Sequence, residues 1–220
     1  YLDMEYKGAQ PPEAIAVPSV KQFQMYQKAA NGLIRYITLA PEHDPEFALT
    51  RYCKETGVVV SMGHSSATYE QAMMGIANGA TSMTHVFNGM TPFHHRKPGL
   101  VGTAFRVRDI YGDSLRAKHC PSGGEYELGG HPIEIRDNGL AYLKGTDTIA
   151  GSTLHINCGL RLLVEEALVP FDAALNACTI NPARCLRVDD HKGRLAAGYD
   201  ADLVVLEDNY DVCQTYCKGV

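Results

Sequence analysis

Hydrophobic and polar positions in the first ninety residues follow a strand–helix rhythm. Segments rich in β-branched and aromatic residues predict strands at residues 34–40, 57–62 and 81–87. Segments with helical spacing come before and between them, at residues 17–30, 45–56 and 69–79. Strands that alternate with helices in this way indicate βαβ units and a parallel sheet.

The pattern changes in the second half of the chain. Residues 125–145 alternate around Gly-Gly and Asn-Gly pairs, which predicts short hairpins. Residues 151–188 return to helical spacing, and residues 192–220 are rich in strand formers separated by glycine turns. We therefore expect one large α/β domain over residues 1–190, with a hairpin insertion at about 123–146, and a separate small β layer over residues 191–220.

Two histidines each lie at the C-terminal end of a predicted strand. His64 comes after VVVSM and a glycine, and His85 comes after TSM and a threonine. Neighbouring parallel strands place their carboxyl ends on the same side of a sheet, which in a (β/α)₈ barrel is the side of the active site. Because such a barrel usually needs about 250 residues, we expect either a smaller fold or a barrel that is incomplete in this chain.

These positions leave two interpretations open. Two neutral imidazoles at neighbouring strand ends can bind a zinc-like ion, and catalytic zinc takes three protein ligands and one water. Alternatively, His64 caps the following turn and His85 packs in a core.

Three other polar side chains are candidates for chemistry. Asp113, in YGDSLRAK, is either a helix cap or a general base and acid. Glu42, after a predicted strand, either orients a ligand, binds a metal or begins a helix. Arg96 can bind phosphate through its planar fork or lie in a solvated loop, and we expect the adjacent His94 and His95 to lie on the surface or pack.

The composition excludes some classes of protein. The chain is 45% hydrophobic with a formal net charge of −5, which argues against nucleic acid as a partner. It has no run of about 18 or more apolar residues, so we expect no membrane partner, and it begins without a signal-peptide pattern. The cysteines show no C-x-x-C pair, and we expect reduced thiols in a cytoplasmic protein.

Six motifs occur along the chain in one order: ITLAPE (37–42), GHSSATYEQA (63–72), THVFNGMTPFHHRKPG (84–99), DTIAGSTL (147–154), NPAR (181–184) and GRLAAGYDADLVVL (193–206). The most specific is the run T-H-x-F-N-x-M followed by H-H-R-x-P-G. Together the motifs resemble the N-acetylglucosamine-6-phosphate deacetylases, a family of metal-dependent amidohydrolases.

The resemblance implies an α/β fold: a (β/α)₈ TIM-type barrel with a small β-sandwich domain formed with the chain ends. It implies that His64 and His85 bind a divalent metal, with zinc as the first choice and iron, cobalt or manganese as alternatives. It implies that Asp113 is catalytic, that the substrate is an amino-sugar phosphate and that the protein is a homodimer. The substrate contacts that it implies are Ala9, Gln10, Asn88, Gly89, Arg96, Ile149, Ala150 and Gly151.

The chain departs from the family pattern in three places. The family's metal-binding glutamate lies in an E-G-P motif that we expect before Tyr1. A D-G-x-H segment and a helix precede the family's catalytic aspartate, whereas here Gly112 runs directly into Asp113. Gln10 stands where the family usually has histidine. Deacetylation of N-acetylgalactosamine-6-phosphate, hydrolysis of a cyclic amide, and non-catalytic binding of a sugar phosphate therefore remain alternatives.

Overall fold

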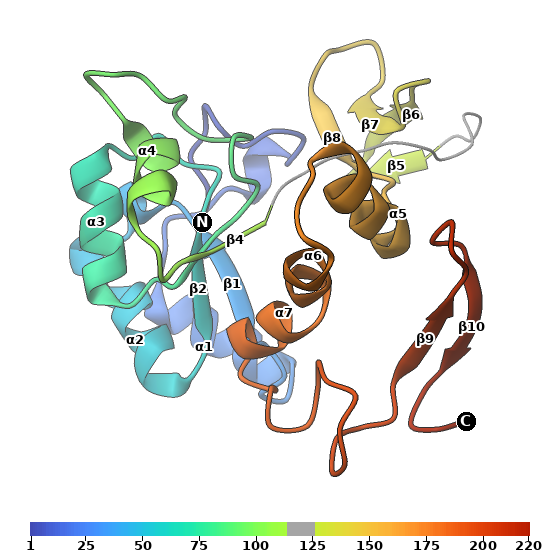
Figure 1. Ribbon diagram of the computed structural model, residues 1–220. Helices are drawn as coiled ribbons and strands as arrows, with labels where there is room; N and C mark the ends of the chain where they lie inside the picture. The colour runs from blue at the N-terminus through green and yellow to red at the C-terminus, as the bar shows by residue number, and fades with distance from the viewer. Residues whose placement is uncertain (114–125) are drawn as a thin grey trace. The chain divides into compact units, whose positions relative to one another are not determined.

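The computed structural model describes residues 1–113 and 126–220 (Figure 1). The described residues divide into two compact units. One contains residues 1–113, 126–136 and 140–151, and the other contains residues 137–139 and 152–220. In the described part of the chain, no helix combines the length and the apolar character needed to cross a membrane.

A parallel sheet lies at the centre of the first unit, with its strands in the order β1-β2-β3-β4. The register places Leu39 opposite Met62, Met62 opposite Met83, and Met83 opposite Gly112. The carboxyl ends of all four strands therefore form one row. The strands are β1 (Tyr36–Leu39), β2 (Val59–Met62), β3 (Ser82–Met83) and β4 (Tyr111–Gly112).

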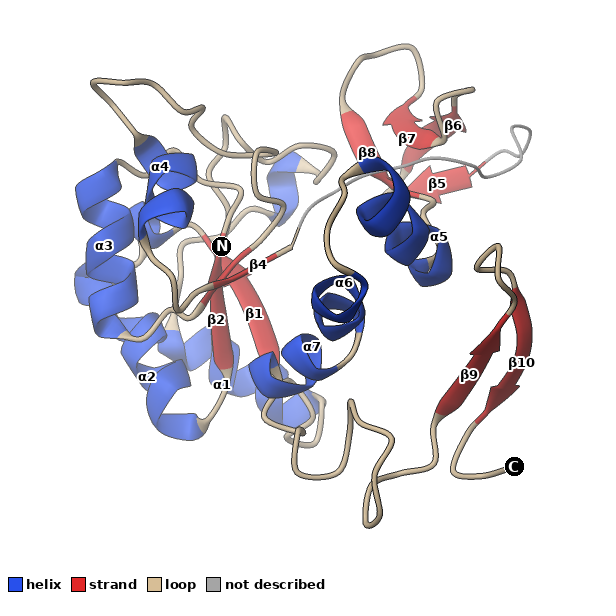
Figure 2. Ribbon diagram, in the orientation of Figure 1, coloured by secondary structure: helices blue, strands red, loops and turns tan. Residues whose placement is uncertain are grey.

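Helices follow the first three strands and lie beside the sheet (Figure 2). One face of the sheet packs a core in which Leu39, Met62 and Met83 are fully buried. The helices of this unit are α1 (Val20–Ala29), α2 (Ala48–Thr56), α3 (Tyr69–Asn78) and α4 (Gly99–Arg106), with 3₁₀ turns η1 (Pro12–Ala14), η2 (Pro41–His43) and η3 (Pro45–Phe47). The strand–helix rhythm predicted for residues 34–79 is confirmed.

Hydroxyl groups occupy the alternate positions of the strands. The Thr84 hydroxyl lies 2.9 Å from that of Thr38 and 2.6 Å from that of Ser61, and the Tyr36 hydroxyl lies 2.9 Å from that of Ser82. Buried polar groups need such partners, because an unpaired one costs about 1–3 kcal/mol. The sheet therefore has an apolar face toward the core and an opposite face of hydrogen-bonded hydroxyl groups. This second set includes Thr84, the residue before His85.

Helix α2 begins later than the pattern predicted. Glu46 and Phe47 have left-handed backbone, with φ of 53° and 55°, so the predicted helix at 45–56 is regular only from Ala48. By contrast, α3 begins as predicted, at Tyr69, and Thr68 caps it in a capping box with Gln71.

The predicted end of the third strand was wrong. Strand β3 ends at Met83 rather than at residue 87, because His85 and Phe87 adopt left-handed backbone with φ of 56° and 77°. Helix α4, which begins at Gly99 after a glycine- and proline-rich stretch, was not predicted.

The predicted hairpins are present as a separate sheet with the order β5-β6-β7-β8. The first two pairs of strands are antiparallel. Strand β8 contains Gly151, where the helical stretch was expected to begin. The strands are β5 (Tyr126–Leu128), β6 (His131–Ile135), β7 (Leu140–Leu143) and β8 (Ile149–Ser152).

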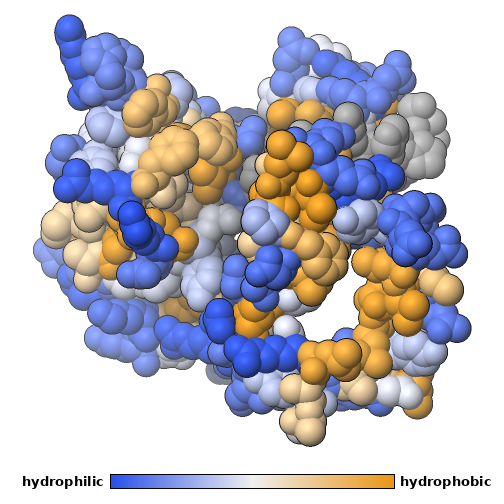
Figure 3. All heavy atoms as spheres, viewed as in Figure 1, coloured by the Kyte–Doolittle hydropathy of each residue, from blue (hydrophilic) through white to orange (hydrophobic). Residues whose placement is uncertain are grey.

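The second unit is helical and then forms a hairpin. It contains α5 (Ile156–Arg161), the π-helix η4 (Leu162–Glu166), α6 (Phe171–Cys178), α7 (Ile180–Cys185), β9 (Leu203–Leu206) and β10 (Val212–Tyr216). Strands β9 and β10 pair in antiparallel fashion. Their Val204, Val205 and Val212 are exposed, and hydrophobic side chains are visible over this hairpin in Figure 3. The β-sandwich remains a prediction.

Candidate metal and catalytic site

Three candidate residues meet at the carboxyl ends of neighbouring strands. His64 follows β2, His85 follows β3 and Asp113 follows β4. The rings of His64 and His85 lie 5.5 Å apart between centroids at an angle of 77°. The Nδ1 atom of His85 lies 3.6 Å from Oδ2 of Asp113. Parallel topology therefore assembles side chains that are up to 49 positions apart in the sequence.

The surroundings of His64 determine which of its ring nitrogens carries the proton. Its Nδ1 lies 2.8 Å from the carbonyl oxygen of Tyr6. A carbonyl can only accept a hydrogen bond, so Nδ1 carries the hydrogen, and Nε2 of the neutral ring has a free lone pair. This arrangement is typical of histidines that bind metals.

Two glycines lie against the His64 ring, where a side chain would have little space. A Cβ at Gly89 would lie 3.2 Å from Nδ1 of His64, and one at Gly8 would lie 3.4 Å from its Cε1. Both glycines also have positive φ, at 58° and 61°, which side chains disfavour. His64 itself has left-handed backbone, with φ of 49°. Such strain persists only where the surrounding structure holds it, and it often marks functional sites.

His85 has a buried nitrogen that lacks a hydrogen-bond partner. Among the described residues, nothing bonds to its Nδ1. Burial lowers the pKa of the His85 imidazole, an effect that the Asp113 carboxylate opposes and that His64 reinforces. The ring is therefore held in its neutral form, which is the form that binds metal ions.

Asp113 is fixed through its backbone, while much of its side chain faces solvent. Its N–H donates to the Met83 carbonyl at 3.1 Å, and its carbonyl accepts from the Val86 N–H at 2.8 Å. Its carboxylate accepts the backbone N–H of His85. The side chain is nevertheless 58% exposed, which leaves a carboxylate oxygen able to reach a ligand. The rest of the motif, residues 114–118, lies outside the described residues.

The two histidines offer donor atoms that suit a divalent metal ion. Nε2 of His64 has a lone pair, Nδ1 of His85 lacks a hydrogen bond among the described residues, and imidazole nitrogens are ligands that zinc prefers. The Asp113 carboxylate lies beside His85. Among the described residues, these three side chains do not bring their ligand atoms within 4.8 Å of one another, so the histidines alone are the candidate ligands here.

A second group of potential ligands lies nearby. Ligand atoms of Asp3, Glu42 and His43 all lie within 4.8 Å of one another. Both carboxylates, however, already accept hydrogen bonds, including those from Ser66 to each of them. Burial raises the pKa of Asp3, but hydrogen bonds from His43, Ser66 and the N–H groups of Glu5 and Tyr6 together hold that pKa below its ordinary value. We interpret this group as a hydrogen-bonded network.

The expected substrate contacts of the 88–89 loop lie beside both histidines. The Asn88 N–H donates to the His85 carbonyl at 2.6 Å, and the Ser65 N–H donates to the Gly89 carbonyl at 3.1 Å. Ala9 is buried one residue after the glycine that packs on His64, and Gln10 is exposed.

The remaining expected contacts lie on other elements. Arg96 is exposed and lines a cavity of about 330 Å³ with the first residues of α3 and α4. Its backbone N–H donates to Nδ1 of His94, whose ring lies 4.3 Å from that of His95. Ile149, Ala150 and Gly151 form β8 of the hairpin sheet. The part that all of these residues take in binding remains a prediction.

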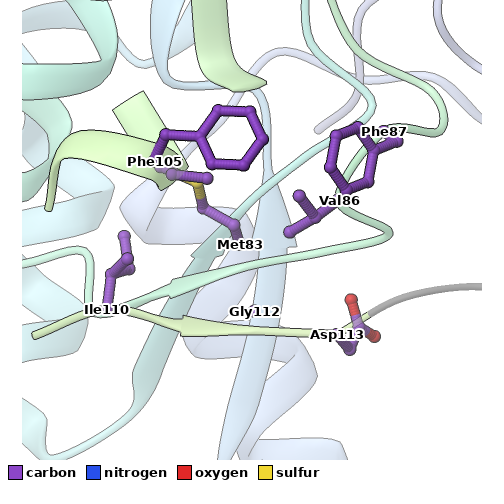
Figure 4. A pocket seen from close by; sticks show the side chains of 8 residues that line it. Met83, Val86, Phe87, Phe105, Ile110, Gly112 and Asp113 are labelled. Carbon is purple, nitrogen blue, oxygen red and sulfur yellow. The ribbon is translucent and has the colours of Figure 1, made fainter. Parts of the chain in front are cut away.

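The sequence did not reveal an apolar cavity of about 250 Å³ beside Asp113 (Figure 4). Phe87, Phe105 and Val86 line it near one end of β4, and Asp113 lies beyond Gly112 at the carboxyl end of that strand. The Phe87 and Phe105 rings are 5.8 Å apart. The apolar residues Met83, Val86 and Phe87 would have been the available signal, but they were assigned to a strand.

Comparison with known proteins identifies the class. A model of the amidohydrolase family matches residues 5–220, and the chain belongs to this family of metal-dependent enzymes. All of the chain aligns with the N-acetylglucosamine-6-phosphate deacetylase of Bacillus subtilis, at 35% identity over 249 residues and 62% of that protein. It also aligns throughout with the N-acetylgalactosamine-6-phosphate deacetylase of Escherichia coli O157:H7, at 28% identity and 65% of its length.

A solved structure agrees. A mutant N-acetyl-D-glucosamine-6-phosphate deacetylase from Mycobacterium smegmatis, in complex with N-acetyl-D-glucosamine-6-phosphate, superimposes with a TM-score of 0.88 at 31% identity. The match covers 99% of this chain and 65% of that one. The chain thus shares the amidohydrolase barrel fold while spanning less than two thirds of the length of these relatives.

Proposed function

We propose that the protein is a metal-dependent deacetylase that converts N-acetylglucosamine-6-phosphate into glucosamine-6-phosphate and acetate. The observation that carries this proposal is the meeting of His64, His85 and Asp113 at one edge of the parallel sheet. The deacetylases among the relatives support the choice of substrate.

His64 and His85 would hold the divalent ion, together with a further ligand that we expect before Tyr1. When bound, such an ion lowers the pKa of a water molecule and polarises a carbonyl group. Zinc suits the imidazole ligands, and iron, cobalt or manganese are alternatives. Because the Tyr6 carbonyl accepts the hydrogen on Nδ1 of His64, the lone pair of the ring lies on Nε2, where it can bind the ion.

Asp113 would move the proton of the reaction. One of its oxygens accepts the His85 N–H, which leaves the other to take a proton from the attacking water. The protonated carboxyl group then returns this proton to the departing amine as the C–N bond breaks. Because the side chain is largely exposed, it can reach both groups.

Substrate binding would involve residues around the histidines. We assign the sugar phosphate to Asn88 and Arg96, and further contacts to Ala9, Gln10, Gly89, Ile149, Ala150 and Gly151. The guanidinium of Arg96 matches phosphate geometry. As in the family pattern, we expect a homodimer in the cytoplasm, in which Arg96 can serve the partner's site.

A second candidate function is deacetylation of N-acetylgalactosamine-6-phosphate. The E. coli relative carries that name, and Gln10 differs from the usual histidine of the family pattern. The metal and Asp113 chemistry would be the same, and only contacts with the sugar would differ.

The test is acetate release by the full-length, metal-loaded protein from both sugar phosphates, with a chelated control. Faster, chelator-sensitive release from the gluco sugar supports the main proposal. Release from the galacto sugar alone supports the second candidate. Metal binding without release from either sugar contradicts both and means that the resemblance misleads about the substrate. Absence of both metal and release favours a non-catalytic sugar-phosphate sensor.

A further inference from the structure

Two carboxylates, those of Asp3 and Glu42, accept hydrogen bonds from the segments that lie next to His64. Asp3 lies on the N-terminal segment, and Glu42 lies on η2 immediately after β1. Their side chains are only 11% and 7% exposed. Together with His43 and Ser66 we call them the carboxylate brace.

Glu42 fixes the backbone that follows His64. Its Oε2 accepts the Ser65 hydroxyl at 2.6 Å, and its Oε1 accepts the Ser66 N–H at 2.6 Å. The Ser66 hydroxyl lies 3.1 Å from Oε1 of Glu42 and 2.9 Å from Oδ2 of Asp3, so it joins the two carboxylates. This bonding holds the turn that begins with the left-handed backbone of His64.

Asp3 fixes the group that determines the tautomer of His64. Its Oδ1 accepts the N–H groups of Glu5 and Tyr6, at 2.8 and 3.2 Å, and so shapes the turn that carries the Tyr6 carbonyl. That carbonyl accepts the hydrogen on Nδ1 of His64. The backbone N–H of Asp3 also donates to the His64 carbonyl at 2.8 Å. Asp3 therefore reaches His64 through its backbone on one side and through the Tyr6 carbonyl on the other.

We propose that Asp3 is a positioning residue for His64, which acts with Glu42 and Ser66 to fix the backbone and the Nδ1–H tautomer of this histidine. The consequence is a lone pair on Nε2 that is already oriented before a ligand arrives. Groups that orient a metal-binding histidine in this way typically contribute tenfold to hundredfold in metal affinity. The metal part of this inference rests on the proposed function, but the tautomer part does not.

The test compares Asp3→Ala with the control Glu5→Ala in the full-length protein. Glu5 is exposed, lies two residues away, and keeps its backbone N–H when its side chain is removed. ¹⁵N NMR of the metal-free protein at about pH 8.5, where ordinary imidazoles are neutral, reports which nitrogen of His64 carries the hydrogen. Zinc titration measures metal affinity independently of activity.

We expect wild type and Glu5→Ala to show the Nδ1–H form. Asp3→Ala should show a mixture of tautomers and bind zinc about tenfold more weakly. Asp3→Asn keeps an oxygen for the Glu5 and Tyr6 N–H groups and should recover most of the loss. An Asp3→Ala protein with the wild-type tautomer and zinc affinity would overturn the proposal.

A second variant covers the case in which Asp3→Ala does not fold. Ser66→Ala removes the hydroxyl shared by the two carboxylates and should change the tautomer and the affinity in the same direction, by less. If Ser66→Ala leaves both unchanged, the proposal also fails. If the tautomer and affinity respond as expected but neither sugar phosphate is deacetylated, the brace stands and the proposed function fails.

Discussion

His64 and His85 each follow a parallel strand, and each has left-handed backbone, but the groups around them differ. A carboxylate, Glu42, holds the turn after His64 from the end of β1, and another, Asp113, accepts the His85 N–H from the end of β4. Glu42 is almost fully buried and its oxygens are occupied by hydrogen bonds, whereas Asp113 is largely exposed.

The difference between these two carboxylates indicates that one stabilises the structure and the other is available for chemistry. At His64, the ring Nδ1 is hydrogen-bonded to the Tyr6 carbonyl, and the carboxylates of Asp3 and Glu42 accept hydrogen bonds within the protein. These groups are suited to hold the geometry of the histidine. At His85, a ring nitrogen lacks a partner among the described residues and a carboxylate oxygen can reach a ligand. We therefore expect carboxylate changes at His64 to affect stability first, and those at His85 to affect chemistry first.

The largest effect should come from Asp113→Asn. The amide has nearly the same shape but cannot take a proton, so turnover should fall by about 10²–10⁴-fold, the usual contribution of general acid–base catalysis. Metal content should remain close to that of wild type. Acetate release and metal analysis on the same sample measure both. The control is Asp109→Asn, an exposed aspartate that precedes β4, and full activity in Asp113→Asn would remove Asp113 from the mechanism.

The next largest effect should come from Gly63→Ala, which tests whether the backbone before His64 must lie close to the backbone before His85. A Cβ at Gly63 would lie 2.8 Å from both Cβ and the carbonyl oxygen of Thr84, the residue before His85. Overpacking of this kind costs about 1–3 kcal/mol, and it should push the histidines apart and weaken zinc binding. Denaturant unfolding and zinc titration measure the two effects. Gly159→Ala on α5, where the nearest atom is 3.4 Å away, is the control.

Glu42→Gln should destabilise the protein without removing a catalytic group. Its amide nitrogen would face a hydroxyl or N–H that now donates to a carboxylate, and an unsatisfied buried donor costs about 1–3 kcal/mol. Denaturant unfolding measures the change, with Glu46→Gln on the exposed turn η3 as the control. Wild-type stability in Glu42→Gln would mean that the difference in burial between the Glu42 and Asp113 carboxylates has no effect on the free energy of unfolding.

The sequence was sufficient to predict which strand ends meet. Apolar runs before His64 and His85, together with parallel topology, placed the two histidines side by side, and their rings are 5.5 Å apart. The motif resemblance added Asp113, for which the residues alone favoured a helix cap over a catalyst. The cap of α3 at Thr68 was predictable because a capping box depends only on local residues.

Contacts between distant segments could not be predicted in this way. Nothing in the periodicity connects Tyr6 or Asp3 with His64, because the contact depends on how the N-terminal segment lies across the strand ends. The role of Glu42 stayed open for the same reason. The end of β3 was missed because the left-handed backbone at His85 and Phe87 interrupts an otherwise strand-like pattern.

The smallest effect should come from His43→Ala, which also decides between the two groups of potential metal ligands. His43 donates to Asp3 at 2.7 Å, but its side chain is 44% exposed and Asp3 retains bonds from Ser66, Glu5 and Tyr6. An ion pair of this kind contributes about 1 kcal/mol or less. Unfolding should therefore shift only slightly, and zinc affinity should stay at the wild-type value. A strong loss of zinc in His43→Ala, with binding retained in His85→Ala, would instead place the metal among Asp3, Glu42 and His43. It would contradict the assignment of the metal to His64 and His85.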